Sequence, residues 1–240
     1  MSNITMGYIN NKGEFFENIR NIKFQDRKPF LFGKFYTENK NNNNSSTFSD
    51  MDESYGVYIY KSFYDDRKAL RIYKDFINFQ ITFHDDEKLV SELQKRQKNI
   101  KLTEFPTGII TIENKIIGQE IPYYDNHKTI KAEIEEIKDI KKLLLYYKQI
   151  IDIIEELLKN NIYYADLNTG NFLVKNDIIK LIDFESGFIS FDGNYKYIIN
   201  NLINLLKSLK KNLTIDFNFS NNSTIEEIRE EINLKTKRLM

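Results

Sequence analysis

Candidate catalytic and metal-binding residues lie in one stretch, residues 163–185, with the sequence YYADLNTGNFLVKNDIIKLIDFE. Asp166 and Asn171 have four residues between them, an apolar strand follows, and a predicted hairpin leads on to Asp183. Carboxylate and amide oxygens are hard ligands of the kind that Mg²⁺ prefers, and a carboxylate can also accept a proton from a hydroxyl group. The spacing predicts that all three side chains lie at the ends of strands around one cleft. The alternative interpretation is that DLNTGN is only an Asx-rich turn and that IDFE is an ordinary strand end.

In this order, after a predicted long helix and across a hairpin, these residues resemble the catalytic loop and the metal-binding motif of the protein kinase superfamily. The resemblance implies ATP and Mg²⁺ as cofactors, and transfer of the γ-phosphoryl group to a hydroxyl of a protein or a small molecule. It implies that Asp166 is the catalytic residue, which orients the acceptor hydroxyl and accepts its proton. Asn171 and Asp183 would be the metal ligands that hold Mg²⁺ against the phosphates.

The family also needs a strand lysine that holds the α- and β-phosphates, and a helix glutamate that holds this lysine. The resemblance implies Lys74 for the lysine and Glu92 for its partner. Lys61 has almost the same local sequence as Lys74, and Glu87 could replace Glu92, so both alternatives stay open. The predicted hairpin favours Lys74, because the run ALRIYKDF would be a surplus strand if Lys61 lay on the third strand.

The hinge of such a protein, whose backbone groups meet the adenine, is predicted at Gln119-Glu120-Ile121-Pro122. The resemblance therefore implies Glu120 and Ile121 as cofactor-binding residues. This segment falls at the family's usual distance beyond Glu92.

Several positions depart from the family's pattern. The glycine-rich phosphate loop is not visible, and no Ala-Pro-Glu segment follows the metal motif. Tyr164 and Ala165 stand where the family usually has histidine and arginine, and Asn168 stands where protein Ser/Thr kinases have lysine. Glu185 replaces the glycine of the metal motif, and an acidic residue there resembles small-molecule kinases such as choline- or aminoglycoside-type phosphotransferases. These departures leave an alternative function open, a catalytically weak or inactive pseudokinase that acts as a nucleotide-binding or scaffolding module.

The elements that must position these residues are predicted from the period of the apolar residues and from turn signals. They are a strand at residues 29–36, a hairpin at 56–76, a helix at 85–98, strands at 108–114 and 115–124, a helical region at 131–159, a hairpin at 171–185, a helix at 194–212 and a last helix capped by Ser223 or Thr224. The predicted class is α+β with a two-lobed kinase-like fold. One kinase-like domain would cover residues 1–240, with a small antiparallel N-lobe at about residues 28–123 and a truncated helical C-lobe at about residues 124–240.

The composition narrows the possible functions. The 240 residues carry 35 basic and 35 acidic side chains, so the overall charge gives no reason to expect a nucleic-acid or membrane partner. The absence of cysteine excludes disulfides, thiolate zinc sites and cysteine nucleophiles. No stretch approaches the roughly 18 apolar residues of a membrane helix, and no secretory signal is visible. We therefore expect a cytoplasmic protein whose partners are a nucleotide and a phosphoacceptor.

Overall fold

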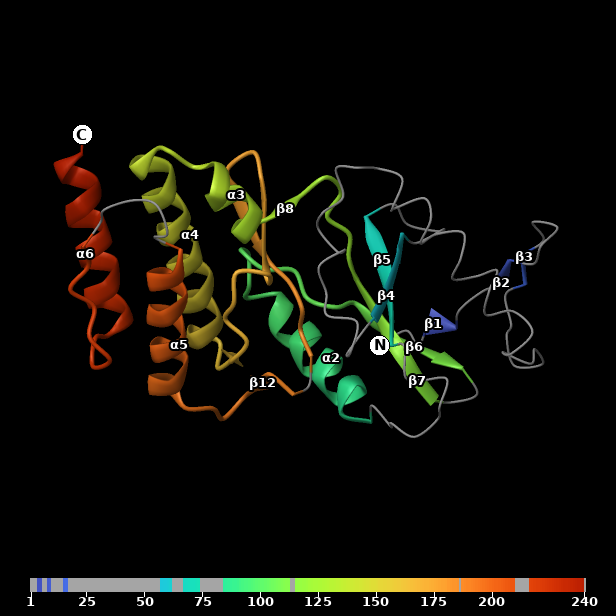
Figure 1. Ribbon diagram of the computed structural model, residues 1–240. Helices are drawn as coiled ribbons and strands as arrows, with labels where there is room; N and C mark the ends of the chain where they lie inside the picture. Colours follow the sequence, from blue (N-terminus) through green and yellow to red (C-terminus); the bar gives the residue numbers. More distant parts are fainter. Residues whose placement is uncertain are drawn as a thin grey trace. The chain divides into compact units, whose positions relative to one another are not determined.

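The computed structural model describes residues 4–5, 8–9, 15–16, 57–61, 67–73, 84–112, 115–185, 187–209 and 216–239. These residues form a mixed α+β structure with small sheets that are mainly antiparallel, which confirms the predicted class (Figure 1). Two compact units are present. The first consists of Met1–Gln97 and Phe105–Asn126, and the second of Lys98–Glu104 and His127–Met240.

The first unit is built on a five-stranded sheet with a helix inserted in the chain between its strands. The strand order is β1-β6-β7-β5-β4, and every neighbouring pair is antiparallel except β1 with β6, which is parallel. The elements are β1 (Ile4–Thr5), β4 (Val57–Lys61), β5 (Lys68–Tyr73), α2 (His84–Gln97), β6 (Gly108–Ile112) and β7 (Lys115–Pro122), with a separate hairpin of β2 (Tyr8–Ile9) and β3 (Phe15–Phe16).

The sequence patterns explain this arrangement. The alternating runs around residues 56–76 form the predicted hairpin of β4 and β5, in which Val57 lies opposite Tyr73. Helix α2 buries Leu89, Val90 and Leu93, which recur at helical spacing on one face. The strand predicted at residues 29–36 lies outside the described residues.

The described residues of the second unit form four helices and two small sheets. One sheet has the order β11-β10-β8, and the other pairs β12 with β9. The elements are β8 (Lys128–Thr129), α3 (Ile130–Glu136), α4 (Ile140–Lys159), β9 (Tyr163–Tyr164), β10 (Phe172–Lys175), β11 (Ile178–Leu181), β12 (Ile189–Ser190), α5 (Tyr195–Ser208) and α6 (Ile225–Arg238).

The helical region predicted as one segment at residues 131–159 is two helices. The chain is extended at Ile137, whose side chain is buried, and α4 then begins after Asp139. The Asp139 carboxylate accepts a hydrogen bond of 2.8 Å from the backbone of Lys141, which caps α4. The far end of α4 follows the prediction, because Asn161 adopts the left-handed conformation (φ 54°) that asparagine tolerates.

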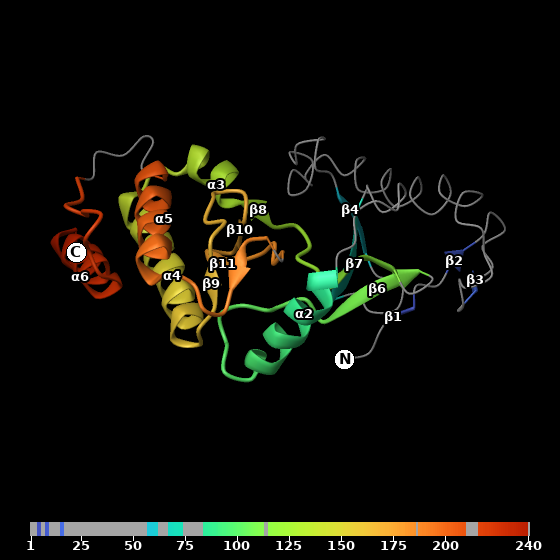
Figure 2. The ribbon, with the colours of Figure 1, turned by 90° about the horizontal axis from the view of Figure 1, so that it is seen from below.

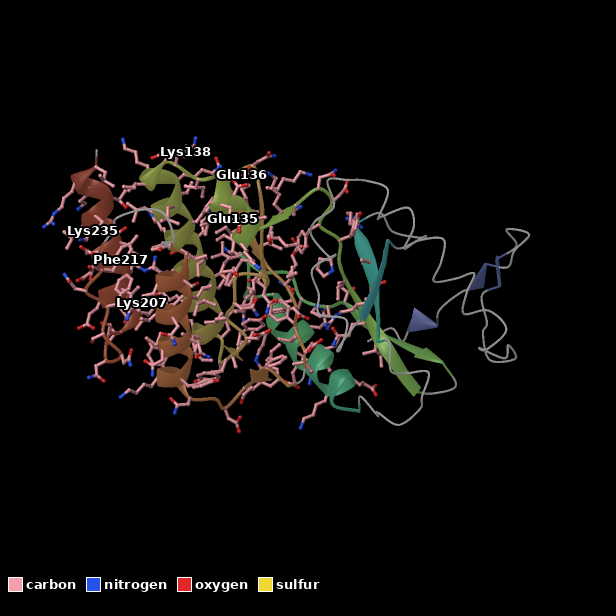
Figure 3. All side chains as sticks on the ribbon, in the orientation of Figure 1. Glu135, Glu136, Lys138, Lys207, Phe217 and Lys235 are labelled. Carbon is pink, nitrogen blue, oxygen red and sulfur yellow. The ribbon has the colours of Figure 1, made fainter. Side chains whose placement is uncertain are left out.

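The core of the second unit is the broad apolar stripe of α4. Helices α5 and α6 lie beside α4 (Figures 1 and 2). The Tyr147 hydroxyl donates a 2.6 Å hydrogen bond to the carbonyl of Leu206 on α5, and its ring packs against Phe217, which is labelled in Figure 3. Arg229 of α6 pairs with two carboxylates of α4, Asp152 and Glu155.

The last helix begins where the sequence predicts. Thr224 caps α6 in a capping box, in which its side chain accepts from the backbone of Glu227 and the Glu227 carboxylate accepts from the backbone of Thr224. Within the described part of the chain, no helix has the length and apolar character needed to cross a membrane.

Candidate functional site

The loop between β9 and β10 carries Asp166 and Asn171, and its backbone is held from two sides. The Ala165 amide donates a 2.8 Å hydrogen bond to the carbonyl of Phe188. The Ala165 carbonyl accepts one of 3.0 Å from the side chain of Asn201 on α5. Both backbone groups of the residue that precedes Asp166 are therefore fixed by other elements, so the loop presents Asp166 from a defined position.

Asn171 faces Asp166 with its amide nitrogen. Nδ2 lies 2.7 Å from Asp166 Oδ2, 3.0 Å from the Asp166 carbonyl and 2.9 Å from the Tyr164 hydroxyl. A carboxylate and a carbonyl only accept hydrogen bonds, so the orientation of this amide is unambiguous. The carbonyl oxygen Oδ1 of Asn171 consequently points away from Asp166 and keeps its lone pairs for another partner.

The hairpin of β10 and β11 brings Asp183 to Asn171. Phe172 lies opposite Leu181, and the Ile182 amide donates a 2.9 Å hydrogen bond to the Asn171 carbonyl. The chain leaves the hairpin with Asp183 at φ 71°, a left-handed conformation that is uncommon for residues other than glycine and is often found at functional sites. The structure thus brings Asp166, Asn171 and Asp183 together within one cluster.

Tyr164 is the centre of this cluster. Its side chain is 1% exposed, and its hydroxyl accepts from Asn171 and lies 3.0 and 3.2 Å from the carbonyls of Ile182 and Asp183. Burial, together with the negative charges of Asp183 and Asp166, raises the pKa of Tyr164 well above its ordinary value, so the hydroxyl stays a donor. Its ring packs against the buried ring of Phe184 at 5.4 Å between centroids.

Sequence reasoning treated Tyr164 and Asn168 only as departures from a pattern, and both belong to the cluster. Asn168 donates a 2.8 Å hydrogen bond to Asp166 Oδ1 and accepts one of 2.8 Å from the Gly170 amide. The second contact is an Asx turn, for which the triplet Asn-Thr-Gly was an available signal. No comparable local signal exists for Tyr164, because its partners lie 18 and 19 residues further along the chain.

The tip of the β10–β11 hairpin is anchored on α4. Asn176 (φ 50°) and Asp177 (φ 62°) form a two-residue turn of the kind that needs left-handed conformations at both positions. Gln149 of α4 holds the chain where it leaves this turn, donating 2.7 Å to the Asp177 carbonyl and accepting 3.0 Å from the Ile179 amide. Asn171 and Asp183, which flank the other end of the hairpin, therefore rest on a fixed support.

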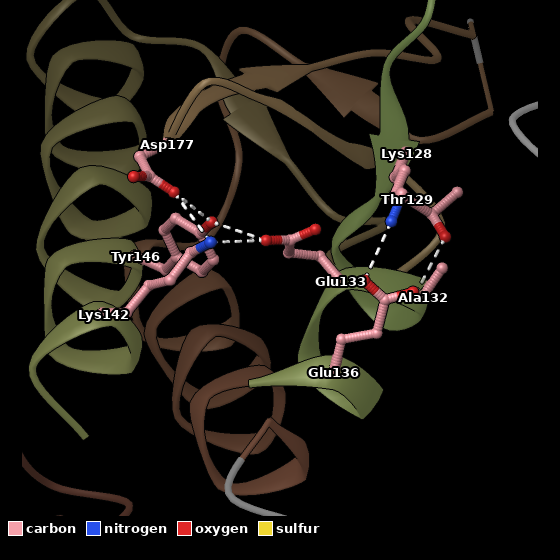
Figure 4. A network of polar contacts seen from close by, with 8 residues as sticks. All are labelled: Lys128, Thr129, Ala132, Glu133, Glu136, Lys142, Tyr146 and Asp177. Carbon is pink, nitrogen blue, oxygen red and sulfur yellow. Dashed lines mark hydrogen bonds and ion pairs between the residues drawn. The ribbon is translucent and has the colours of Figure 1, made fainter. Parts of the chain in front are cut away.

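A polar network completes this anchor (Figure 4). Lys142 lies 2.7 Å from Glu133 and 2.9 Å from Asp177, and the Tyr146 hydroxyl donates to Asp177 at 2.9 Å. The hydrogen bond to Glu133, followed by the one to Asp177, raises the pKa of Lys142. The hydrogen bonds of Lys142 and Tyr146 lower the pKa of Asp177.

The predicted site residues of the first unit are Lys74, Glu92, Glu120 and Ile121. Lys74 lies outside the described residues, directly after β5, and its alternative Lys61 is the last residue of β4. Glu92 is bound by cations of its own helix, Lys95 and Arg96, each at 2.6 Å. Their hydrogen bonds lower the pKa of Glu92 to about 2.

Glu120, which is predicted to lie in the hinge, is part of a strand in the structure. This residue is interior to β7, opposite Leu70 on β5 and Gly108 on β6, and its carbonyl accepts a 2.8 Å hydrogen bond from Thr107. Its side chain is 1% exposed and is paired with Lys68 at 2.5 Å. Sheet pairing continues past Ile121 to Pro122, and the contact of this segment with adenine stays a prediction. Glu120 is therefore a strand residue with a structural ion pair.

The donor set of the cluster fits a hard divalent cation. Among the described residues, no group of three or more His, Cys, Asp or Glu side chains is placed to hold a metal ion. Mg²⁺ does not require such a group, because it is commonly bound by one or two protein oxygens together with phosphates and water. The oriented Oδ1 of Asn171 and the carboxylate of Asp183 are oxygens of this kind.

The fold and the site together define an α+β protein with a loop that joins an aspartate, an asparagine and the backbone of a second aspartate. No protein-family model matches the chain, and a search of curated proteins gives no match either.

Proposed function

We propose that this protein is an ATP- and Mg²⁺-dependent phosphotransferase with a two-lobed kinase-like fold. The observation that carries the proposal is the cluster in which Tyr164 and Asn171 hold Asp166 and the backbone of Asp183 together. The two residue types needed for proton acceptance and for Mg²⁺ binding meet there in the order and spacing of the kinase motifs.

The succession of elements supports the proposal. Strands β4 and β5, helix α2, strands β6 and β7, the long helix α4, the β10–β11 hairpin and the closing helices follow one another in the predicted order. Asp166 comes shortly after the long helix and Asp183 directly after the hairpin, as the resemblance requires.

In the proposed reaction, Asp166 orients the acceptor hydroxyl and accepts its proton while the acceptor oxygen bonds to the γ-phosphorus of ATP, and ADP leaves. Asn171 and Asp183 would hold Mg²⁺, which supplies neutralisation of the phosphate charge when it is bound. Lys74, or Lys61 in its place, would bind the phosphates. Catalysis of this type depends mainly on positioning and electrostatics, which agrees with a loop whose side chains are hydrogen-bonded to one another.

The acceptor is the hydroxyl of a protein or of a small molecule. Glu185 in place of glycine favours the small molecule, because an acidic residue there resembles small-molecule phosphotransferases. Asn168 in place of lysine departs from the pattern of protein Ser/Thr kinases.

Nucleotide binding is tested by thermal unfolding of the purified chain with ATP and Mg²⁺. A ligand that binds only the folded state at about 100 times its Kd adds about 2.7 kcal/mol of stability. We expect a rise in Tm with ATP and Mg²⁺, and loss of its Mg²⁺-dependent part in Asp183→Asn. The absence of any response to millimolar nucleotide would contradict the proposal.

Turnover is tested with γ-labelled ATP and Mg²⁺, with and without cell extract, next to Asp166→Ala. Removal of a positioned base commonly lowers the rate by about 10² to 10⁴. Label transfer that disappears in Asp166→Ala supports the enzyme. Nucleotide binding without transfer, or equal transfer by both proteins, would favour the pseudokinase.

A further inference from the structure

The carboxylate of Asp166 is held at both of its oxygens by two asparagines of the same loop. Asn171 donates to Oδ2 at 2.7 Å, and Asn168 donates to Oδ1 at 2.8 Å. Rotation about the last side-chain bond of Asp166 would break both contacts at once. The carboxyl plane therefore has one favoured orientation within the loop.

The role of Asn168 in this arrangement follows from its own contacts. The Gly170 amide lies 2.8 Å from Asn168 Oδ1 and can only donate, so Oδ1 must face Gly170 and the NH₂ group must face Asp166. The backbone reinforces this turn, because the Asn168 amide donates to the Asp166 carbonyl at 3.0 Å. A Cβ atom at Gly170 would lie only 3.1 Å from Asn168 Oδ1, so glycine leaves the side chain its room.

We propose that Asn168 is a positioning residue, whose side-chain NH₂ group fixes the orientation of the Asp166 carboxylate for the acceptor hydroxyl. The proposal rests on the phosphotransferase function proposed above. A lysine at this position would bring a positive charge, whereas asparagine brings a neutral donor that is tied to its own turn. Asn168 acts through Asp166, and we assign it no contact with substrate.

The substitution Asn168→Asp removes the side-chain donor to Asp166 but keeps the acceptor that forms the turn. Aspartate has nearly the same shape and still accepts from the Gly170 amide, but it donates to Asp166 only when it carries a proton. Two carboxylates at hydrogen-bonding distance share one proton at low pH and repel each other once that proton is lost. Asp183 and Glu185 are the other ionisable groups around Tyr164. They are unchanged in Asn168→Asp, so a difference in pH profile from wild type comes from residue 168.

The first measurement is the pH profile of label transfer. Asn168→Asp should approach the wild-type kcat at about pH 5 and fall roughly tenfold to a hundredfold below it as the pH rises to about 8, with KM for ATP unchanged. Asn168→Ala should be low at every pH. The matched control is Asn176→Asp, the same chemical change in the hairpin turn, which should keep the wild-type profile. If Asn168→Asp also keeps the wild-type profile, Asn168 serves only the turn and the proposal is wrong.

The second measurement does not require activity. In ¹H–¹⁵N spectra of the full chain, the side-chain NH₂ signals of Asn168, assigned by their loss in Asn168→Asp, should shift as the pH is lowered through the titration of the carboxylate. The shift should disappear in Asp166→Asn. NH₂ signals that titrate alike in wild type and Asp166→Asn would overturn the proposal even if the enzyme is active. If the NH₂ signals shift with pH in wild type and not in Asp166→Asn, but no label is transferred, the result contradicts the phosphotransferase function alone.

Discussion

The hydroxyl of Tyr164 lies 2.9 Å from the amide nitrogen of Asn171, and the same oxygen lies 3.0 Å from the carbonyl of Ile182. One buried atom thereby links the loop after β9 to the chain that leaves the β10–β11 hairpin. This link and the pairing of β10 with β11 hold Asn171 and Asp183 near each other. Asn171 comes directly before β10, and Asp183 follows β11.

Tyr164→Phe should destabilise the protein by about 1 to 3 kcal/mol, because two half-buried carbonyls lose a donor and the buried Asn171 loses one acceptor. The ring contact with Phe184 is kept, so the change reports on the hydroxyl. Urea unfolding followed by circular dichroism measures the effect. The control is Tyr163→Phe, because the Tyr163 hydroxyl makes no hydrogen bond with any of the described residues. Its free energy of unfolding should change by less than about 0.5 kcal/mol. Equal effects of the two substitutions would disprove the linking role of Tyr164.

Gly193→Ala should destabilise the segment that packs on β9. A Cβ atom at Gly193 would lie 2.6 Å from Cβ and 2.7 Å from Cγ of Tyr163, and this Cβ atom cannot move away without moving the strand. Forced overpacking of this kind costs about 1 to 3 kcal/mol. The matched control is Gly187→Ala, where a Cβ meets nothing within 4 Å, and this change should be neutral or stabilising by up to about 1 kcal/mol. A Tm that falls equally in both variants would refute the explanation by close packing.

Asp177→Asn should remove a pH-dependent part of the stability. The pKa of Asp177 in the folded protein is lowered from 3.8 by its hydrogen bonds to Lys142 and Tyr146, so the unfolded state takes up the proton first as the pH falls. The stabilisation is therefore complete above about pH 5 and is lost as the pH falls below the unfolded value. The difference in unfolding free energy between wild type and Asp177→Asn should be constant from about pH 7 to 5 and shrink by about pH 3.

The control for this prediction is Glu135→Gln, an exposed carboxylate of α3 with no ion pair among the described residues (Figure 3). It should leave the unfolding free energy nearly unchanged at every pH. A difference between wild type and Asp177→Asn that stays constant down to about pH 3 would show that the network of Figure 4 does not hold Asp177 as a carboxylate.

Local patterns determined much of the fold. The apolar spacing of α2 and α4, the hairpin at residues 171–185 and the cap at Thr224 were all readable from the sequence, because each depends on residues that are close together in the chain. The break between α3 and α4 was not readable from the sequence, because it depends on the extended backbone of Ile137, which is stabilised by the burial of this residue in the unit.

In the candidate site, too, some features were predictable from local sequence and others depended on packing. Spacing and strand pattern are enough to predict that Asp166 and Asn171 share one loop and that Asp183 follows the hairpin. The contacts of the Tyr164 hydroxyl with these residues, and the burial of Glu120 beside Lys68, became visible only in the folded chain. The physical reason is that a hydrogen bond or ion pair between distant residues exists only where packing brings its two atoms within about 3 Å, and no local pattern encodes that distance.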